Sequence, residues 1–322
     1  MTDSARPVLL DCDPGHDDAI AIMLAVADPG IDLLAVTTVA GNVTLPNTTR
    51  NALRVLDMVD RPDIPVAAGR DRPRARDLST AAVMHGESGL AGPLPVEPSR
   101  AALDVPAIEL IEQVLRDADE PVTLVATGPL TNMADVVERL PHLHDRILEL
   151  VIMGGAVDLG NWTPAAEFNI WVDPEAADIV FSAGAVPGGG PEAGIGLTMI
   201  GLEVTHQAWL DDAHAAAFRG QGKAGQFVAE LLDHFVGFHQ DRFGWPGAPI
   251  HDAVTIAHLI DPSLVQTMSM NVQIETQSSL CMGRTVADRW SVTGRAPNAA
   301  VGLGIDRDRF VTLLLQRLGT LP

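Results

Sequence analysis

Short apolar segments alternate with longer helical patterns through the first two thirds of this chain of 322 residues. Such alternation is typical of repeated β-α units, which feed a largely parallel sheet. We therefore predict an α/β fold with an open, mostly parallel, Rossmann-like sheet flanked by helices. The predicted strands lie near residues 7–12, 31–40, 64–68, 122–127, 149–153 and 197–203, and the predicted helices between them span 18–28, 45–59, 105–117, 131–140 and 174–183.

The last third of the chain is expected to supply edge strands and a helical cover. Nothing in the composition marks a domain boundary, so residues 1–322 are expected to form a single domain. The segment 184–196, rich in Gly and Pro, is expected to be a loop extension between a helix and a strand. Its glycines match neither the dinucleotide-binding pattern nor the P-loop pattern. The predicted elements of the last third are helices at 223–242, 252–260 and 307–318 and strands at 270–275, 284–290 and 299–305.

The chain is strongly acidic, with 42 Asp and Glu against 21 Lys and Arg and a formal charge of -21. A field of this sign repels phosphate backbones and anionic lipid heads, so neither nucleic acid nor a membrane is expected as a partner. The two cysteines, Cys12 and Cys281, are too few for a disulfide framework or a thiolate metal site. This usage fits a reducing compartment, and the expected location is the cytoplasm. The first residues lack the features of an export signal, so export is not expected.

Four carboxylates crowd the end of the first predicted strand, in the segment Asp11-Cys12-Asp13-Pro14-Gly15-His16-Asp17-Asp18. Helix capping explains Asp17 or Asp18, but it does not explain Asp13 four residues earlier. Two carboxylates about 4.5 Å apart repel each other by roughly 4 kcal/mol at an effective dielectric constant of about 20, and a cation reverses the sign of that interaction. Oxygen ligands without a nearby Cys or His set favour calcium or magnesium, and a mixed shell of carboxylate, carbonyl and water favours calcium.

Polar residues also follow other predicted strands, where ligands bind in open α/β sheets. Asn42 follows the second strand, and the Thr127 carbonyl after the fourth is a possible neutral ligand. A long loop with polar residues at 161–169 follows the fifth strand, and long loops in compact domains tend to be functional. His251-Asp252 opens a later helix. Taken singly, Asn42 fits an ordinary turn residue. Asp252 fits an acidic residue that complements the helix dipole at the N-terminus of a helix.

Taken together, these segments resemble the inosine-uridine-preferring nucleoside hydrolase family. The segment 11–18 is similar to the N-terminal signature of that family. His85-Gly86-Glu87-Ser88-Gly89, the 161–169 loop and His251-Asp252 follow in the family's order, so the resemblance covers essentially the full chain. Within the family, the 161–169 loop and His239-Gln240 look most like the pyrimidine-specific ribonucleoside hydrolases.

The resemblance implies a role for each matching residue. One calcium ion per subunit is held by Asp13, Asp18, the Thr127 carbonyl and Asp252, and Asp13 is also the general base. The ribose diol is bound by Asp17, Asn42 and Asn169, the 5′ hydroxyl by Asn161 and Glu167, and Met153 and Phe168 also contact the substrate. His85, His239 and His251 face the base. The resemblance further implies a homotetramer or homodimer and a role in nucleoside salvage.

The implied reaction is hydrolysis of the N-glycosidic bond of uridine or cytidine to base and ribose by calcium-activated water. Carboxylates suit the positive charge of an oxocarbenium-like transition state, and a placed general base contributes about 10² to 10⁴ in rate. The chain has no tyrosine, so histidine is the expected donor to the leaving base, with His239 and His251 as candidates. The acidic site favours an unphosphorylated nucleoside, and a site built for the 2′ hydroxyl rejects deoxynucleosides.

Three alternatives remain open from the sequence. The first is a hydrolase that accepts inosine as well as uridine. The second is an Asp-x-Asp phosphatase in which Asp11 attacks phosphate and Asp13 acts as acid and base beside magnesium. That chemistry requires a lysine, and the only one, Lys223, lies in a Gly-flanked stretch. The third is a calcium-dependent nucleoside sensor, which would return its ligand intact.

Overall fold

A nine-stranded sheet forms the centre of the molecule. The computed structural model describes residues 5–93, 96–188 and 194–322. The strands of the sheet are β1 (Arg6–Cys12), β2 (Ile31–Thr38), β3 (Val66–Ala68), β4 (Val122–Ala126), β5 (Ile147–Met153), β6 (Gly184–Ala185), β7 (Ile195–Ile200), β10 (Val265–Met270) and β13 (Ala299–Ile305). Their order is β10-β13-β7-β5-β4-β1-β2-β3, and β6 pairs with β7 beside this path. Only the β10–β13 pair is antiparallel among these described strands, so the predicted mostly parallel sheet is confirmed.

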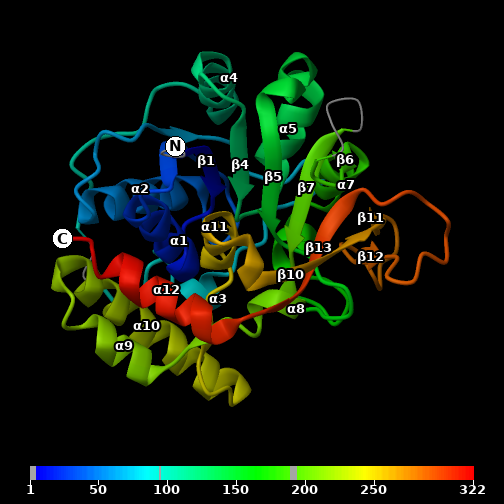
Figure 1. Ribbon diagram of the computed structural model, residues 1–322. Coiled ribbons are helices and arrows are strands. Elements are labelled where there is room, and N and C mark those ends of the chain that lie inside the picture. Colours follow the sequence, from blue (N-terminus) through cyan, green and yellow to red (C-terminus); the bar gives the residue numbers. More distant parts are fainter. Residues whose placement is uncertain (1–4, 94–95, 189–193) are drawn as a thin grey trace.

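Helices cover both faces of the sheet (Figure 1). One apolar cluster joins the sheet to α1 (His16–Ala27), α2 (Leu45–Met58), α10 (Gly222–Phe243), α11 (Ala253–Ile260) and α12 (Arg307–Leu318). A second cluster joins the opposite face to α4 (Ala107–Asp117), α5 (Thr131–Arg139) and α7 (Pro174–Ser182). The centre of β1, Val8 to Leu10, is continuously apolar, because Val8 and Leu10 enter the first cluster and Leu9 the second.

Helix α1 is buried all round, as its apolar sequence predicts. It packs against α2, α10, α11 and α12 as well as against the sheet, and every residue from His16 to Ala25 is buried. The start of this helix therefore lies in the interior, at the carboxyl end of β1.

The remaining described elements are short. They are α3 (Ala82–His85), the 3-10 helix η1 (Pro141–Arg146), α6 (Phe168–Val172), α8 (Leu202–Thr205), α9 (Asp212–Phe218), the 3-10 helix η2 (Pro262–Leu264) and the small antiparallel pairs β8 (Trp209–Leu210) with β9 (Ala248–Pro249) and β11 (Val272–Ile274) with β12 (Thr285–Ala287). The β11–β12 pair lies in the orange segment that projects from the side of the molecule in Figure 1.

Three local predictions differ from the structure. The predicted strand 270–275 contains β11, but Met270 belongs to β10 and the two strands lie in separate sheets. The predicted strand 197–203 already ends at Ile200, because α8 begins at Leu202. Strand β10 escaped prediction because its four central residues are exposed at the sheet edge and show no apolar alternation. The predicted loop 184–196 contains β6, which pairs with Ile195 and Gly196 of β7. Residues 189–193 of that segment lie outside the described residues.

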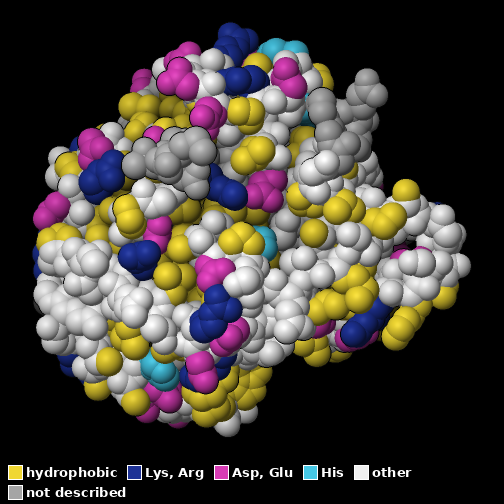
Figure 2. Space-filling model, in the orientation of Figure 1, with side chains coloured by type: hydrophobic (Ala, Val, Ile, Leu, Met, Phe, Trp, Pro, Cys, Tyr) yellow, Lys and Arg dark blue, Asp and Glu magenta, His cyan; other side chains and the backbone are white. Residues whose placement is uncertain are grey.

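Acidic and basic side chains are interspersed on the face seen in Figure 2. This face therefore shows no continuous basic surface of the kind that nucleic acids require. Within the described ranges, none of the helices combines the length and apolarity needed to span a bilayer.

Candidate active site

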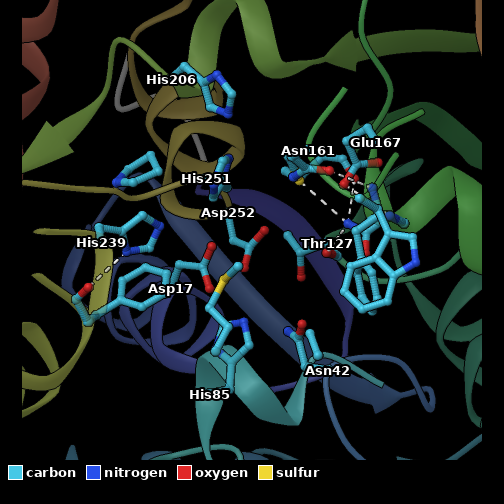
Figure 3. A pocket seen from close by; sticks show the side chains of 18 of the residues that line it. Asp17, Asn42, His85, Thr127, Asn161, Glu167, His206, His239, His251 and Asp252 are labelled. Atoms are coloured by element: carbon cyan, nitrogen blue, oxygen red, sulfur yellow. Dashed lines mark hydrogen bonds between the residues drawn. The ribbon is translucent and has the colours of Figure 1, made fainter. Parts of the chain in front are cut away.

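A pocket of about 290 Å³ lies beyond the carboxyl ends of the central strands. Figure 3 shows Thr127 and Asp252 near its centre, with His85, His239 and His251 on one side and Asn161 and Glu167 on the other. Most of the site residues predicted from the sequence line this pocket. They are Asp17, Asn42, His85, Thr127, Met153, Asn161, Glu167, Phe168, Asn169, His239, His251 and Asp252. The two others, Asp13 and Asp18, are fully buried and do not line it.

The turn between β1 and α1 orients Asp18. Gly15 is the N-cap of α1, and Asp18 at the third helical position accepts hydrogen bonds from the Gly15 N–H (3.0 Å) and the Asp13 N–H (3.3 Å). The Thr127 hydroxyl donates a further bond to Asp18 Oδ1 at 2.8 Å. Helix capping therefore accounts for the position of Asp18. Through its bond from Thr127, Asp18 also links the turn between β1 and α1 to the end of β4.

Asp13 is held from one side only. Its Oδ2 accepts a hydrogen bond from the Asn42 N–H at 2.6 Å, whereas its Oδ1 is buried without a hydrogen-bond partner in the described residues. The Asn42 side-chain amide donates to the Asp13 carbonyl and to Asp18 Oδ2, both at 3.2 Å. Gly41 and Gly128 pack against the two Asp13 carboxylate oxygens, where a Cβ would lie 2.1 Å from Oδ2 and 2.8 Å from Oδ1.

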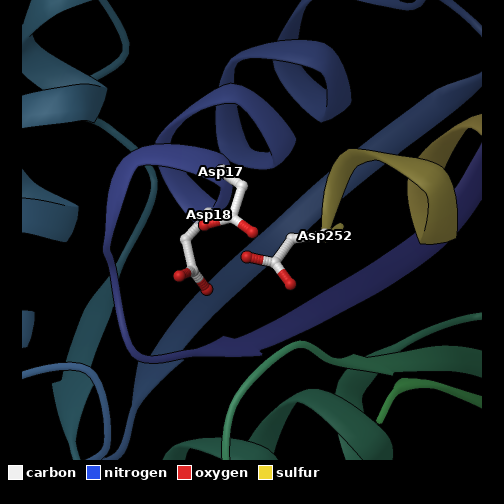
Figure 4. A group of neighbouring side chains, drawn as sticks. All are labelled: Asp17, Asp18 and Asp252. Carbon is white, nitrogen blue, oxygen red and sulfur yellow. The ribbon is translucent and has the colours of Figure 1, made fainter. Parts of the chain in front are cut away.

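Three carboxylates converge at the floor of the pocket. Asp17, Asp18 and Asp252 each offer an oxygen within 4.8 Å of the others, the first two from α1 and the third from the start of α11 (Figure 4). Burial, followed by the charge of Asp18, raises the pKa of Asp17 to about 7. Burial and the neighbouring carboxylates also raise the pKa values of Asp13 and Asp252.

This donor set fits a hard cation. No Lys or Arg is among the residues that line the pocket, so no basic side chain there neutralises the buried carboxylates. The unpartnered Asp13 Oδ1 and the all-oxygen donors suit a divalent ion such as Ca²⁺ or Mg²⁺. The converging cluster of carboxylates can bind a metal ion, but it contains Asp17, which the predicted metal set did not, and it lacks Asp13.

Asn169 connects the ends of β4 and β5. Its side-chain amide donates to the Thr127 carbonyl at 2.8 Å and to the Met153 carbonyl at 3.0 Å. The Oδ1 atoms of Asn42 and Asn169 make no hydrogen bond within the part of the chain that the structure describes. Both oxygens are therefore available as acceptors at the pocket.

The 161–169 loop forms the opposite end of the pocket. Glu167 caps α6 and accepts from the backbone N–H groups of Asn169 (2.9 Å), Gly155 (2.9 Å) and Ile170 (3.2 Å). Burial outweighs these bonds and raises the pKa of Glu167 to about 7. Asn161 Oδ1 accepts from the Phe168 N–H at 2.9 Å, so the Asn161 NH₂ group is the part left to donate to a ligand.

The histidine side of the pocket is buried, and burial lowers the pKa values of His85, His239 and His251. His239 Nδ1 lies 2.8 Å from the Phe235 carbonyl, and His251 Nδ1 lies 2.7 Å from the Thr205 hydroxyl. These rings are therefore neutral near pH 7, and each has one nitrogen engaged by the protein.

Sequence reasoning missed several lining residues on this side, namely Phe235, Phe243, Trp245 and His206. Trp245 stacks on His239 with ring centroids 5.7 Å apart, and His206 meets Trp245 edge-on. His206 comes shortly after β7, so extending the strand-end rule to that strand would have found it. Lys223 lies 3.5 Å from Asp60 and does not line the pocket, which removes the lysine that the phosphatase alternative requires.

The chain is similar to known proteins over nearly its whole length. A family model described as inosine-uridine preferring nucleoside hydrolase matches residues 8–312. The pyrimidine-specific ribonucleoside hydrolase RihA of Citrobacter koseri is 51% identical over 316 residues, covering 98% of both chains. RihA of Escherichia coli O7:K1 is 50% identical with the same coverage.

Solved structures share the fold. The purine-preferring ribonucleoside hydrolase from Gardnerella vaginalis has a TM-score of 0.88 at 30% identity, covering 98% of both chains. The plant nucleoside hydrolase PpNRh1 has the same TM-score at 32% identity, covering 98% of this chain and 99% of its own.

Proposed function

The chain belongs to the inosine-uridine preferring nucleoside hydrolase family, and on that premise we propose that it is a calcium-dependent hydrolase of unphosphorylated pyrimidine ribonucleosides. It is an enzyme that hydrolyses the N-glycosidic bond of a nucleoside and releases the base and ribose. The observation that carries the proposal is the buried acidic floor of the pocket, which has no Lys or Arg among its lining residues.

The metal ligands in this proposal are Asp13, Asp18, the Thr127 carbonyl and Asp252. The unpartnered Asp13 Oδ1 and the raised carboxyl pKa values support an ion at this place. When bound, a calcium ion supplies charge that increases the acidity of a water molecule and binds the ribose diol. Asp13 then acts as the general base that takes a proton from the attacking water.

The ribose is bound by groups whose hydrogen-bonding roles are already set. Asn42 and Asn169 direct their NH₂ groups to the protein, which leaves their oxygens to accept from the 2′ and 3′ hydroxyls together with Asp17. At the other end, the Asn161 NH₂ group and Glu167 bind the 5′ hydroxyl. A 5′ phosphate would meet Glu167, and no Lys or Arg lines the pocket to pair with it, so nucleotides are poor substrates.

The base lies between His85, His239 and His251, with His239 and His251 as the two candidate donors to the leaving base. Pyrimidine preference is supported by the 51% identity to an enzyme described as pyrimidine-specific, against 30% to one described as purine-preferring. A hydrolase that also accepts inosine is the second candidate. We further propose a single domain, a cytoplasmic location and a role in nucleoside salvage. We also propose a homotetramer or homodimer, and sedimentation velocity tests this oligomeric state.

The deciding experiment incubates the purified protein with uridine, cytidine and inosine and measures the reducing sugar released. We expect kcat/KM to be higher for the two pyrimidines, and activity to disappear in EGTA and to return with excess Ca²⁺. Asp13→Asn, which keeps the shape of the side chain, should lower kcat by about 10² to 10⁴. Full activity after exhaustive chelation would contradict the metal proposal, and a preference for inosine would contradict the pyrimidine proposal.

A further inference from the structure

Thr205 lies directly behind one of the pocket histidines. It is the last residue of α8, the short helix that follows β7, and its side chain is fully buried. Its hydroxyl oxygen is 2.7 Å from His251 Nδ1. Thr205 does not line the pocket, whereas His251 does, so the contact is made on the protein side of the imidazole ring.

The direction of this hydrogen bond follows from the other partners of Thr205. A threonine hydroxyl in a helix usually donates to the carbonyl four residues earlier, here that of Gly201. That carbonyl already accepts from the backbone N–H groups of Val204 (3.0 Å) and Thr205 (3.1 Å). Within the described residues, His251 Nδ1 is the only hydrogen-bond partner found for the hydroxyl.

The hydroxyl therefore donates and His251 Nδ1 accepts. The reverse arrangement would bury an O–H group without an acceptor, which is unfavourable. In a neutral imidazole with an accepting Nδ1, the proton is on Nε2.

His239 has the opposite arrangement. Its Nδ1 lies 2.8 Å from the Phe235 carbonyl, which can only accept, so Nδ1 carries the proton. The Nε2 atom of neutral His239 is then an acceptor. Of the two candidate base-side histidines, the hydrogen bonds behind the pocket leave only His251 with a ring N–H to offer.

We propose that Thr205 is a positioning residue, which donates a hydrogen bond to His251 Nδ1 and thereby holds His251 in the tautomer whose Nε2–H is a donor to the departing base. This inference rests on the proposed function. In the reaction, the C1′–N1 bond breaks with its electron pair on the base, the water oxygen bonds to C1′, and a water proton goes to Asp13. The negative charge on the pyrimidine spreads to its carbonyl oxygens, one of which accepts from His251 Nε2–H. His251 keeps its proton, and the base takes one from solvent after release.

The test compares two substrates in three variants. Thr205→Val removes the hydroxyl at nearly constant volume, and Thr205→Ser retains it. Thr48→Val is the matched control, because the Thr48 hydroxyl is also in a helix and donates to the Leu45 carbonyl away from the pocket. Uridine requires stabilisation of its leaving base, whereas the nitrophenolate of p-nitrophenyl β-ribofuranoside leaves as a stable anion.

We expect Thr205→Val to lower kcat on uridine roughly 10- to 100-fold with little change in KM, the range for residues that orient a functional group. The nitrophenyl riboside should be hydrolysed within a few-fold of the wild-type rate, and Thr205→Ser and Thr48→Val should behave like wild type on both substrates. Equal loss on both substrates would mean a merely structural role and would overturn the inference.

A spectroscopic measurement separates this inference from the proposed function. In ¹⁵N NMR of histidine-labelled protein, with His251→Gln to assign the signal, the proton of His251 should be on Nε2 in the wild type, and this preference should weaken in Thr205→Val. A proton on Nδ1 in the wild type would overturn the inference. Wild-type protein that hydrolyses no ribonucleoside, but shows the Nε2–H tautomer, would overturn the proposed function instead.

Discussion

Replacing Gly41 by alanine tests how Asp13 is held without changing a charged or polar group. The new Cβ would lie 2.1 Å from Asp13 Oδ2 and 2.7 Å from the Pro129 ring. Because the proline is rigid, most of the relief must come from Asp13. Extending the contact to 3.0 Å, the lower limit of real Cβ contacts, moves the carboxylate by about 1 Å. That movement also breaks the 2.6 Å bond from the Asn42 N–H.

A displacement of about 1 Å in a reacting group lowers the rate about 100-fold, or about 2.7 kcal/mol in activation free energy. We therefore expect Gly41→Ala to lower kcat on uridine by about this factor, and overpacking to lower stability by about 1–3 kcal/mol. The assay is the initial rate of reducing-sugar release at saturating Ca²⁺, normalised to folded protein measured by circular dichroism.

The matched control is Gly220→Ala, since a Cβ at Gly220 would meet no atom within 4 Å. This variant should keep wild-type kcat and stability. If Gly41→Ala does not fold, Asp13→Asn still tests whether Asp13 is the general base. A folded Gly41→Ala protein with wild-type kcat would refute the reasoning, because the general base would then tolerate displacement.

Three further predictions follow from the same site. Burial raises the pKa of Asp17 to about 7, so the metal-free protein holds this proton more tightly than the unfolded chain does. The linked stability is complete below about pH 4 and is lost as the pH rises toward 7, by up to about 4 kcal/mol. The melting temperature in EGTA should therefore fall from pH 5 to pH 7.5, and excess Ca²⁺ should remove most of that fall. A flat profile in EGTA would contradict this. Deoxycytidine should have a kcat/KM roughly 10⁴- to 10⁵-fold below that of cytidine, and equal values would exclude binding through the 2′ hydroxyl. Asn161→Asp replaces the free NH₂ donor by an acceptor and should raise KM for uridine about 10-fold. The KM for 5′-deoxyuridine should stay unchanged, because this substrate lacks the 5′ hydroxyl. An equal rise in KM for both substrates would argue against the 5′ contact.

The ribose half of the site was predictable because its residues follow parallel strands. Such strands bring their carboxyl ends to one edge, so residues as distant as Asn42 and Thr127 had to approach each other. The structure brings both to the pocket, with Asp17 from the first turn of α1. The pattern of acidic and amide residues was therefore informative before any coordinates.

The exact group of converging carboxylates was not predictable. Asp17 joins Asp18 and Asp252 because the Gly15 cap and Asp18 fix the first turn of α1 in one orientation. Asp13 is instead turned toward the Asn42 N–H. The orientations of these carboxylates depend on side-chain rotamers and on close packing at Gly41. The spacing of residues in the sequence predicts neither.

The aromatic half was harder to predict for a different reason. Phe235 and His239 lie four residues apart on one face of α10, a pattern that also fits an ordinary core helix. Only the packing of α10 and of the following turn at Trp245 over the sheet shows that this face borders a pocket.

The two halves of the pocket come from different parts of the architecture. The sugar end is built on strand termini of the central sheet, and the nucleobase end depends largely on α10 and the segments that follow α8 and α10. The nucleobase preference can therefore change through the cover segments while the acidic and ribose-binding groups on the sheet stay the same. Laboratory libraries aimed at new leaving groups should be confined to the cover segments and should leave Thr205 and His251 unchanged.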